Sequence, residues 1–339
     1  MRWNKGFSAQ YYATFVDPVT WRDIERFEIT GGKVKRTDSG LRCSADIDCV
    51  RYDQQTERYI RIWLDTYQYG VFSHNALFTG LATAPEREIN GNLEENSLAC
   101  YSVLKPAQDV LLPLGYYVPM GIDGGQLVKQ LLSEVIPAPV TINGNLPALS
   151  QYIVAEDNEN HLSMLEKILA ATNGRLRVLG SGEVEVRPMA TEITVRFDPL
   201  SNDSIEPQLK AVNDWYSCPN VFRAVMDDTS AVARDDSLNS PLSTVNRGRE
   251  VWVEEKNCDL AENETLAEYA QRRLKEEQRH YLAVDYDRRF YPEILPSDLV
   301  QLEYPKQRIS GNFYVVEQSV ELGYGAKTSE EVVQIWVQD

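Results

Sequence analysis

The spacing of apolar positions along the chain predicts two β-rich regions with a helical region between them. In the first hundred residues apolar and polar side chains alternate, as in Tyr59–Leu64, and glycine turns such as Gly31-Gly32 separate the runs. Alternation with a period of two is typical of half-buried strands. Strands that recur at roughly ten-residue spacing favour a sandwich or a barrel, so residues 1–105 are predicted to be all β.

Between residues 106 and 190 the apolar period becomes helical. Asp123 can cap a first helix, and a second helix is expected at about residues 161–171. Two strand-like runs then flank the turn Gly180-Ser-Gly182, which predicts a hairpin. We therefore expect a small α/β domain with two helices and a hairpin over residues 106–190.

From residue 191 to residue 339 the chain returns to a strand-like pattern that one helix interrupts. The polar, Ser- and Asp-rich stretch 227–246 is predicted to be a loop. A helix over 265–279 begins with Thr265-Leu-Ala-Glu268, where the Thr265 hydroxyl and the Glu268 carboxylate can each accept from the other's backbone amide. Four strand-like runs follow the helix, and its apolar stripe consists of Leu266, Tyr269, Ala270 and Leu274.

Composition places the chain among folded proteins of two or three domains. It has 339 residues, of which 43% are hydrophobic and 25% charged. Its net charge of −17 argues against adhesive binding to nucleic acid or to an anionic membrane, but it suits a surface past which DNA slides. No signal peptide pattern follows Met1, and the most apolar run, Val110 to Met120, is broken by prolines, so no membrane-spanning segment is expected.

The sequence offers no motif that predicts a catalytic, cofactor or metal site. Asp46-Ile-Asp48 and Asp285-Tyr-Asp287 each place two carboxylates on one face of a strand, but hard cations need more oxygen ligands, and solvent-facing acids explain both pairs. Gly121–Gly125 precedes a helix without the lysine ending of a P-loop. The five cysteines lack zinc-ligand spacing and are expected to be reduced thiols in a protein assembled in the cytoplasm.

The tyrosine pairs Tyr11-Tyr12 and Tyr116-Tyr117 permit two interpretations. They could form a shelf that binds sugars, or they could be core or subunit-interface anchors, which the sequence favours. A glycan hydrolase that uses acidic pairs is a further alternative. Its carboxylates would have to face each other across a cleft, and no pattern in the sequence shows such a pair.

In its order of elements the chain resembles the baseplate hub proteins of phage tails and related contractile injection machines. The likeness spans nearly the whole chain and three stretches carry it. The first is the amino-terminal β region with Trp21–Ile29 and Phe78-Thr-Gly80. The second and third are the helix Leu162–Leu169 with its hairpin ending at Pro188, and the helix Leu266–Leu274 with strands around Leu295–Leu302 and Phe313–Val316.

The resemblance implies a mainly β fold with an α+β insert, in which two tail-tube-like β-barrel domains flank the small α/β domain. It implies a homotrimer whose barrels form a pseudo-sixfold ring between the tail tube and the central spike, with a channel that DNA only passes through. Tail-tube protein, spike protein and tape-measure or other baseplate proteins are the implied partners. The implied location is the virion tail baseplate, assembled in the host cytoplasm.

The resemblance also suggests that the charged face of the 265–279 helix contacts the tube or a neighbouring subunit. This face consists of Glu268, Arg272, Arg273 and Glu276. A structural, non-enzymatic role with no cofactor follows from the hub interpretation. The alternative is a tail-tip adhesion module that binds host surface glycans through exposed aromatic side chains.

Overall fold

The computed structural model describes the chain except residues 1, 2, 4, 51, 53–55, 91, 92, 203, 214, 215, 259, 262, 279–281 and 335–339. Its first hundred residues fold into strands, as the alternating pattern predicts. They are β1 (Ser8–Val16), β2 (Asp23–Phe27), β3 (Gly31–Thr37), β4 (Cys43–Cys49), β5 (Arg58–Gln68), β6 (Val71–Ala82), β7 (Glu86–Asn90) and β8 (Leu93–Ser102).

The middle of the chain forms an α/β unit, which we call the middle unit. It contains both predicted helices and the predicted hairpin. Asp123 caps the first helix by accepting from the amide of Gln126 at 2.9 Å, and Asn160 caps the second. The hairpin strands pair with a third, parallel strand that the sequence did not predict. The elements are α1 (Lys105–Asp109), β9 (Tyr117–Val118), α2 (Gly124–Val135), β10 (Val140–Ile142), β11 (Ile153–Val154), α3 (His161–Ala171), β12 (Gly174–Val178) and β13 (Val184–Pro188).

The last part of the chain is again mainly β, and four strands follow its helix as predicted. The strands before the helix are β14 (Ile193–Phe197), β15 (Ile205–Asn213), β16 (Val221–Met226), β17 (Thr229–Arg234) and β18 (Trp252–Lys256), and a short helix, α4 (Thr244–Arg247), precedes β18. The helix itself is α5 (Leu266–Glu277). After it come β19 (Leu282–Arg288), β20 (Leu299–Tyr304), the 3-10 turn η2 (Pro305–Gln307), β21 (Ile309–Glu321) and β22 (Thr328–Gln334).

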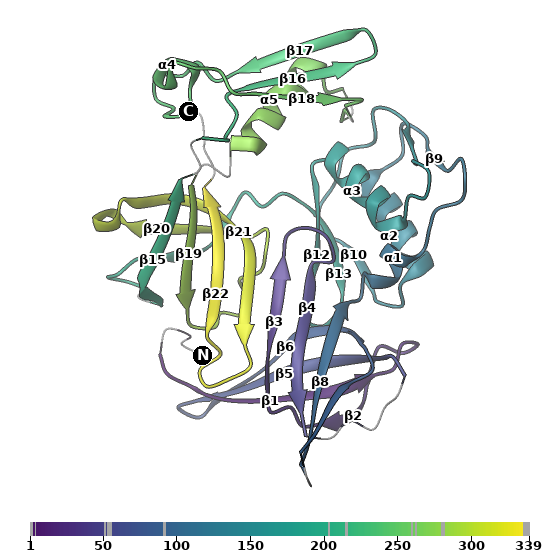
Figure 1. The fold of residues 1–339 in the computed structure, drawn as a ribbon, viewed down its shortest axis with the longest axis vertical. Coiled ribbons are helices and arrows are strands. Elements are labelled where there is room, and N and C mark those ends of the chain that lie inside the picture. The colour runs from purple at the N-terminus through teal and green to yellow at the C-terminus, as the bar shows by residue number, and fades with distance from the viewer. Residues whose placement is uncertain are drawn as a thin grey trace.

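The two β regions are joined into one sheet of 14 described strands. β21 pairs antiparallel with β3, so that Glu317 lies opposite Thr37 and Glu321 opposite Lys33. We call this β3–β21 pairing the seam between the two β regions. Figure 1 shows its strands side by side, with yellow β21 and β22 next to purple β3 and β4. Because β21 occupies the edge of β3, the amino-terminal strands do not close on themselves. The mainly β class is confirmed, whereas no sheet closes into a barrel within the described residues.

The predicted loop over 227–246 is wrong for much of its length. β17 occupies Thr229–Arg234 and pairs with β16 through a tight turn, and α4 occupies Thr244–Arg247. Polar composition concealed the strand because one face of β17 is solvent-exposed and its inward side chains are the small Ala231 and Ala233. A half-buried strand with alanine on its core face gives only a weak alternating signal.

α5 has the predicted capping box, but it does not pack on the large sheet. Its buried side chains Tyr269, Ala270 and Leu274 cover the separate sheet β17-β16-β18 and touch Phe222 and Ala224. We call residues 216–278 the α5 module; it lies at the top of the molecule in Figure 1. Residue 279, the last of the predicted helix, lies outside the described residues.

Placing a carboxylate in the core of the α5 module should unfold that module. Leu274 is 5% exposed, and Leu274→Asp would bury a charge without a designed partner. We expect a loss of about 3–5 kcal/mol, by analogy with other uncompensated buried charges. Local unfolding of the α5 module would appear as faster hydrogen exchange in β16 and β17, with unchanged exchange in β4 and β5. Lys275→Asp, on the exposed face of the same turn, is the control, and equal exchange in both variants would contradict the assignment of the core face.

The turn between β12 and β13 fixes the middle unit to the amino-terminal strands. The Thr79 hydroxyl donates to the carbonyl of Gly180 at 2.8 Å. The indole N–H of Trp21 and one guanidinium N–H of Arg61 both donate to the carbonyl of Ser181 at 3.0 Å. The glycine-rich turn of the predicted hairpin therefore serves as a docking element.

Further contacts join the middle unit to the remaining parts of the chain. Arg177 and Arg187 both pair with Asp298, which is buried next to β20, at 2.8 and 3.4 Å. Gln151 donates to the carbonyl of Cys258 in the α5 module at 2.6 Å. The middle unit is thus in contact with both β regions and with the module. Among the described residues, no helix is long and apolar enough to cross a membrane.

Candidate assembly surfaces

One solvent-facing surface of the large sheet runs across both β regions, and most of its side chains are polar or charged. We call it the polar sheet face. It includes both acidic pairs noted in the sequence, Asp46 with Asp48 on β4 and Asp285 with Asp287 on β19. Strand alternation places its members on the side opposite the core, and its charged members include Lys33, Lys35, Asp46, Asp48, Lys210, Asp285, Asp287, Glu317, Glu321, Lys327 and Glu331.

The centre of the polar sheet face places like charges in cross-strand register. Asp285 lies opposite Glu331, and Glu331 lies opposite Glu317. Lysines bound this row, since Lys210 reaches Asp285 and Lys35 reaches Glu317, each at 2.9 Å. Carboxylates directly opposite each other destabilise a sheet, so folding alone does not favour this row.

One acid of this face, Asp287, has a pKa that its neighbours lower. Burial alone would raise the pKa of Asp287, but hydrogen bonds from Lys327 and Ser329 outweigh it and hold this pKa below its usual value. The hydrogen bond with Asp285 raises the pKa of Lys210. A carboxyl with a depressed pKa contributes stability above its unfolded-state pKa and loses it as pH falls through the lower folded value. The negative charge of Asp287 therefore persists throughout the neutral range.

Directly behind this face, at the seam between the two β regions, lies a buried charge cluster of Arg36, Arg288, Gln318 and Glu330. Both side chains of the Arg288–Glu330 pair have no exposed surface, and Arg288 Nε donates to Glu330 Oε2 at 2.7 Å. Gln318 links the pair to Arg36, accepting from Arg36 Nη1 at 2.6 Å and donating to Glu330 Oε1 at 2.7 Å. Burial lowers the pKa of Arg36 to about 10, because a guanidinium away from water loses hydration.

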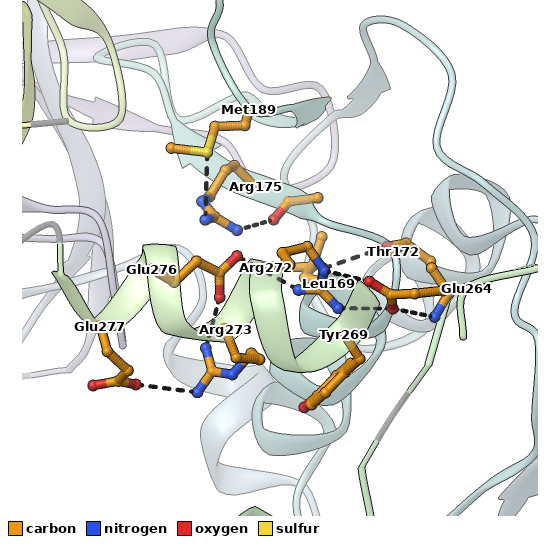
Figure 2. Close-up of polar contacts among 12 residues, drawn as sticks. Leu169, Thr172, Arg175, Met189, Glu264, Tyr269, Arg272, Arg273, Glu276 and Glu277 are labelled. Carbon is orange, nitrogen blue, oxygen red and sulfur yellow. Dashed lines mark hydrogen bonds and ion pairs between the residues drawn. The ribbon is translucent and has the colours of Figure 1, made fainter. Parts of the chain in front are cut away.

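The four residues predicted as an assembly contact lie on α5, and the structure brings three of them into one ion-pair network. Figure 2 shows Glu276 between Arg272 and Arg273, which it contacts at 3.5 and 2.6 Å. Arg272 also holds Glu264 with two hydrogen bonds of 2.8 and 3.0 Å. Glu268 is on another turn, where it accepts from the Thr265 amide in the capping box.

This charged side of α5 faces the middle unit across a cavity of about 280 Å³. Arg273 and Glu276 line one wall, and Arg42, Arg175 and Met189 line another. The side chains of Arg272, Arg273 and Glu276 are only 20%, 28% and 13% exposed. A partner would have to compete with internal ion pairs here, so the role of these residues in assembly stays a prediction that the geometry does not favour.

The structure also places the other candidates from the sequence. Tyr11 and Tyr12 are neighbours on β1 and point to opposite sides, with Tyr11 Oη donating to the carbonyl of Gly323 at 2.9 Å and Arg26 covering the ring of Tyr12. They do not form a shelf for sugars. Among the described residues, no group of three or more His, Cys, Asp or Glu side chains is placed to bind a metal ion.

No protein-family model and no curated protein matches the sequence, but solved structures do match the fold. The tail protein from Neisseria meningitidis MC58 superposes with a TM-score of 0.71 at 14% identity, covering 98% of both chains. The 43 kDa tail protein of prophage MuSo2 from Shewanella oneidensis gives a TM-score of 0.69 at 12% identity, covering 96% of this chain and 97% of that one. The chain has the fold of phage tail proteins.

This fold also occurs outside free phages. A type VI secretion system component of E. coli, described as structurally similar to the T4 bacteriophage tail proteins gp27 and gp5, has a TM-score of 0.55 at 8% identity. The match covers 92% of this chain and 74% of that chain. The order of elements in the sequence indicates a resemblance to hub-like tail and baseplate proteins. At the level of fold, this resemblance is confirmed.

Proposed function

We propose that this chain is a structural, non-enzymatic baseplate hub, located in a virion tail, that joins a tail tube to a central spike. In this role three copies form a ring in which residues 1–105 and 191–339 of each copy supply two tube-like segments. Residues 106–190 decorate the outside of the ring. Tail proteins of the same fold support this role.

The observation that carries the proposal is the continuity of the polar sheet face across both β regions. A ring lined by one sheet needs neighbouring strands to continue from one tube-like segment to the next, and the β3–β21 pairing provides this within a subunit. A channel for DNA needs a wall to which phosphates do not adhere. Acids outnumber lysines among the charged members named above, which gives the wall the required sign. The acids are Asp46, Asp48, Asp285, Asp287, Glu317, Glu321 and Glu331, and the lysines are Lys33, Lys35, Lys210 and Lys327.

The proposal is tested by mass measurement and electron microscopy of the chain mixed with a tail-tube protein and a spike protein from the same tail. We expect a three-subunit species that, seen down its axis, shows a ring of six similar lobes with an open centre. The ring should cap the end of the tube. A chain that stays monomeric with both partners present, or that does not bind the tube, contradicts the proposal.

Charge reversal on the polar sheet face should create DNA binding. Asp46→Lys combined with Asp285→Lys reverses the charge on both halves of the face, whereas the wild-type chain should not retain duplex DNA at about 150 mM salt. We expect the double variant to bind DNA with an affinity that falls steeply as salt rises. Fluorescence anisotropy with labelled duplex DNA measures this effect.

A matched double variant distinguishes an effect of the polar sheet face on DNA binding from an effect of net charge alone. Asp157→Lys combined with Asp228→Lys reverses the same number of exposed charges on the middle unit and on the α5 module. It should bind DNA much more weakly than the first variant. Equal binding by the two variants would mean that this face is not specialised to repel phosphate.

A further inference from the structure

The middle unit contains a two-stranded ribbon that covers one side of its helices. Segments 111–123 and 148–160 run antiparallel, with β9 paired to β11 in their middle and isolated bridges near both ends. Val118 and Ile153 lie opposite each other on the inner side of the ribbon and are buried in the hydrophobic core. Such a ribbon needs apolar side chains only on the side that packs, because its other side meets water.

The outer side of this ribbon is apolar as well. Tyr117 lies opposite Val154, and the two residues are 61% and 51% exposed. Figure 1 shows β9 on the side of the middle unit that is turned away from the large sheet. We call the ribbon face the six large apolar residues of the two segments that are more than half exposed, namely Leu111, Leu114, Tyr117, Met120, Tyr152 and Val154. Folding of the middle unit does not require these side chains to be apolar.

The ribbon face is about as large as one side of a stable protein contact. With values toward the lower end of the 150–250 Å² that aromatic side chains bury, the exposed fractions of its six residues amount to roughly 700 Å². The largest apolar patch on a typical monomer covers about 300–600 Å². Each partner in a standard-size interface buries about 800 Å². Tyrosine and methionine, which supply half of the ribbon face, are also enriched in such interfaces.

Acidic residues border the ribbon face. Asp109 directly precedes the apolar stretch of the first segment, and Glu156 and Asp157 follow that of the second, all three of them exposed. Lys105 and Lys167 each pair with one of these acids, and Asp157 makes the balance of the border negative. A second copy of this face would bring acids against acids. A partner surface edged by lysine or arginine is complementary to it.

We propose that the ribbon face docks a tail protein other than this chain, whose contact surface is apolar and edged by basic residues. The contact rests on the proposed hub function, in which residues 106–190 decorate the outside of the ring. It adds to that function the surface by which the ring is connected to the surrounding tail proteins. Three ribbon faces on the outside of one ring lie apart from one another, so each of them takes its own copy of the partner.

Photo-cross-linking tests the contact in the assembled particle. The chain is made with benzoylphenylalanine in place of Tyr117, both as purified protein and in cells that assemble the complete tail. On illumination, tail particles should give a product in which mass spectrometry finds another tail protein, joined through an apolar surface that has lysine or arginine beside it. The purified chain should give no product between copies. The same group in place of Thr141, an exposed residue of β10, is the control and should not give the tail-protein product.

The variant Tyr117→Asp should remove the partner and keep the fold. Its side chain is exposed in the isolated chain, so the melting temperature should hardly change. A carboxylate within an apolar contact should lower the amount of the cross-linked partner in purified tails by tenfold or more. Thr141→Asp adds the same charge on β10 and should leave that amount unchanged. Equal amounts of partner in the two variants overturn the proposal.

The outcomes also distinguish this contact from the hub function. A cross-link between two copies of this chain overturns the contact, and so does the absence of any product in particles that contain the chain, since the face is then open to solvent or to glycans. Rings that bind the tail tube without a product from residue 117 leave the hub proposal standing. A cross-link to another tail protein in a chain that forms no three-subunit ring supports the contact and contradicts the hub. A chain absent from tail particles contradicts both.

Discussion

Replacing Glu330 with glutamine is expected to destabilise the protein by about 3–5 kcal/mol. Glu330 is the only carboxylate in the buried charge cluster, where it accepts from Arg288 and from Gln318. Without it two guanidinium groups, those of Arg36 and Arg288, remain in the core with no negative charge of the cluster to balance them. Breaking a buried pair on one side leaves the full desolvation cost of the other group.

The loss should appear at the seam between the two β regions. Urea unfolding of the Glu330→Gln variant should give a lower midpoint, and hydrogen exchange should increase first in β3, β21 and β22. The control is Glu331→Gln, the next residue along β22, whose side chain faces solvent on the polar sheet face. An equal midpoint shift in the two variants would contradict the assignment of the cluster as a determinant of stability.

A double replacement distinguishes an uncompensated charge from a lost contact. Arg288→Met combined with Glu330→Leu removes the pair and fills the space with apolar atoms, which in other proteins is neutral or stabilising. We expect this variant to recover a large part of the stability that Glu330→Gln loses. A double variant as unstable as the single one would mean that the geometry of the pair, and not its charge balance, is what matters.

The sequence predicts local structure well because the signals are themselves local. The capping box at Thr265 and Glu268 and the Asp123 cap of α2 involve residues three apart, and the structure has both. The alternation from Leu282 onwards also assigns Asp285 and Asp287 to the solvent side of β19, where the structure has them. A period of two or 3.6 residues needs no knowledge of the remaining chain.

Contacts between distant segments could not be derived in this way. The pairing of Glu317 with Thr37 joins residues 280 positions apart, and no pattern in either strand identifies its partner. The same limit concealed the target of α5, because an apolar stripe shows that a helix is buried but not which sheet it covers. Arg288 shares the core side of β19 with Val284 and Tyr286, so the alternation in the sequence already indicates a buried arginine. Its partner, Glu330, can be identified only from the fold.

The assembly surfaces depend on the same long-range information. Each acidic pair, at Asp46 and at Asp285, is visible in the sequence as an isolated feature. Only the β3–β21 seam reveals that they belong to one face. The turn between β5 and β6 gives a local signal in the sequence, because the dipeptide Tyr69-Gly70 lies between two strand-like runs where a hairpin turn normally has Asn-Gly.

Gly180→Ala is expected to detach the middle unit from the amino-terminal strands. A Cβ at this position would lie 1.8 Å from the carbonyl oxygen of Ala76 and 2.5 Å from its carbonyl carbon, so backbone and not a flexible side chain obstructs it. The turn must move away, which breaks the hydrogen bond from Thr79 to Gly180 and those from Trp21 and Arg61 to Ser181. Strain of about 1–3 kcal/mol and about 1 kcal/mol for each lost hydrogen bond add to a large effect.

Limited proteolysis and hydrogen exchange can show whether detachment, and not general unfolding, is the result. The Gly180→Ala variant should expose β12 and β13 and the facing residues of β5 and β6 to exchange, while the buried charge cluster stays protected. Gly323→Ala is the matched control, since a Cβ at Gly323 in the turn between β21 and β22 would meet no atom within 4 Å. If the two variants behave alike, close backbone contact at this turn does not hold the middle unit in place. If only Gly180→Ala loosens it, the close approach of Gly180 to the Ala76 carbonyl determines how the middle unit is positioned on the sheet.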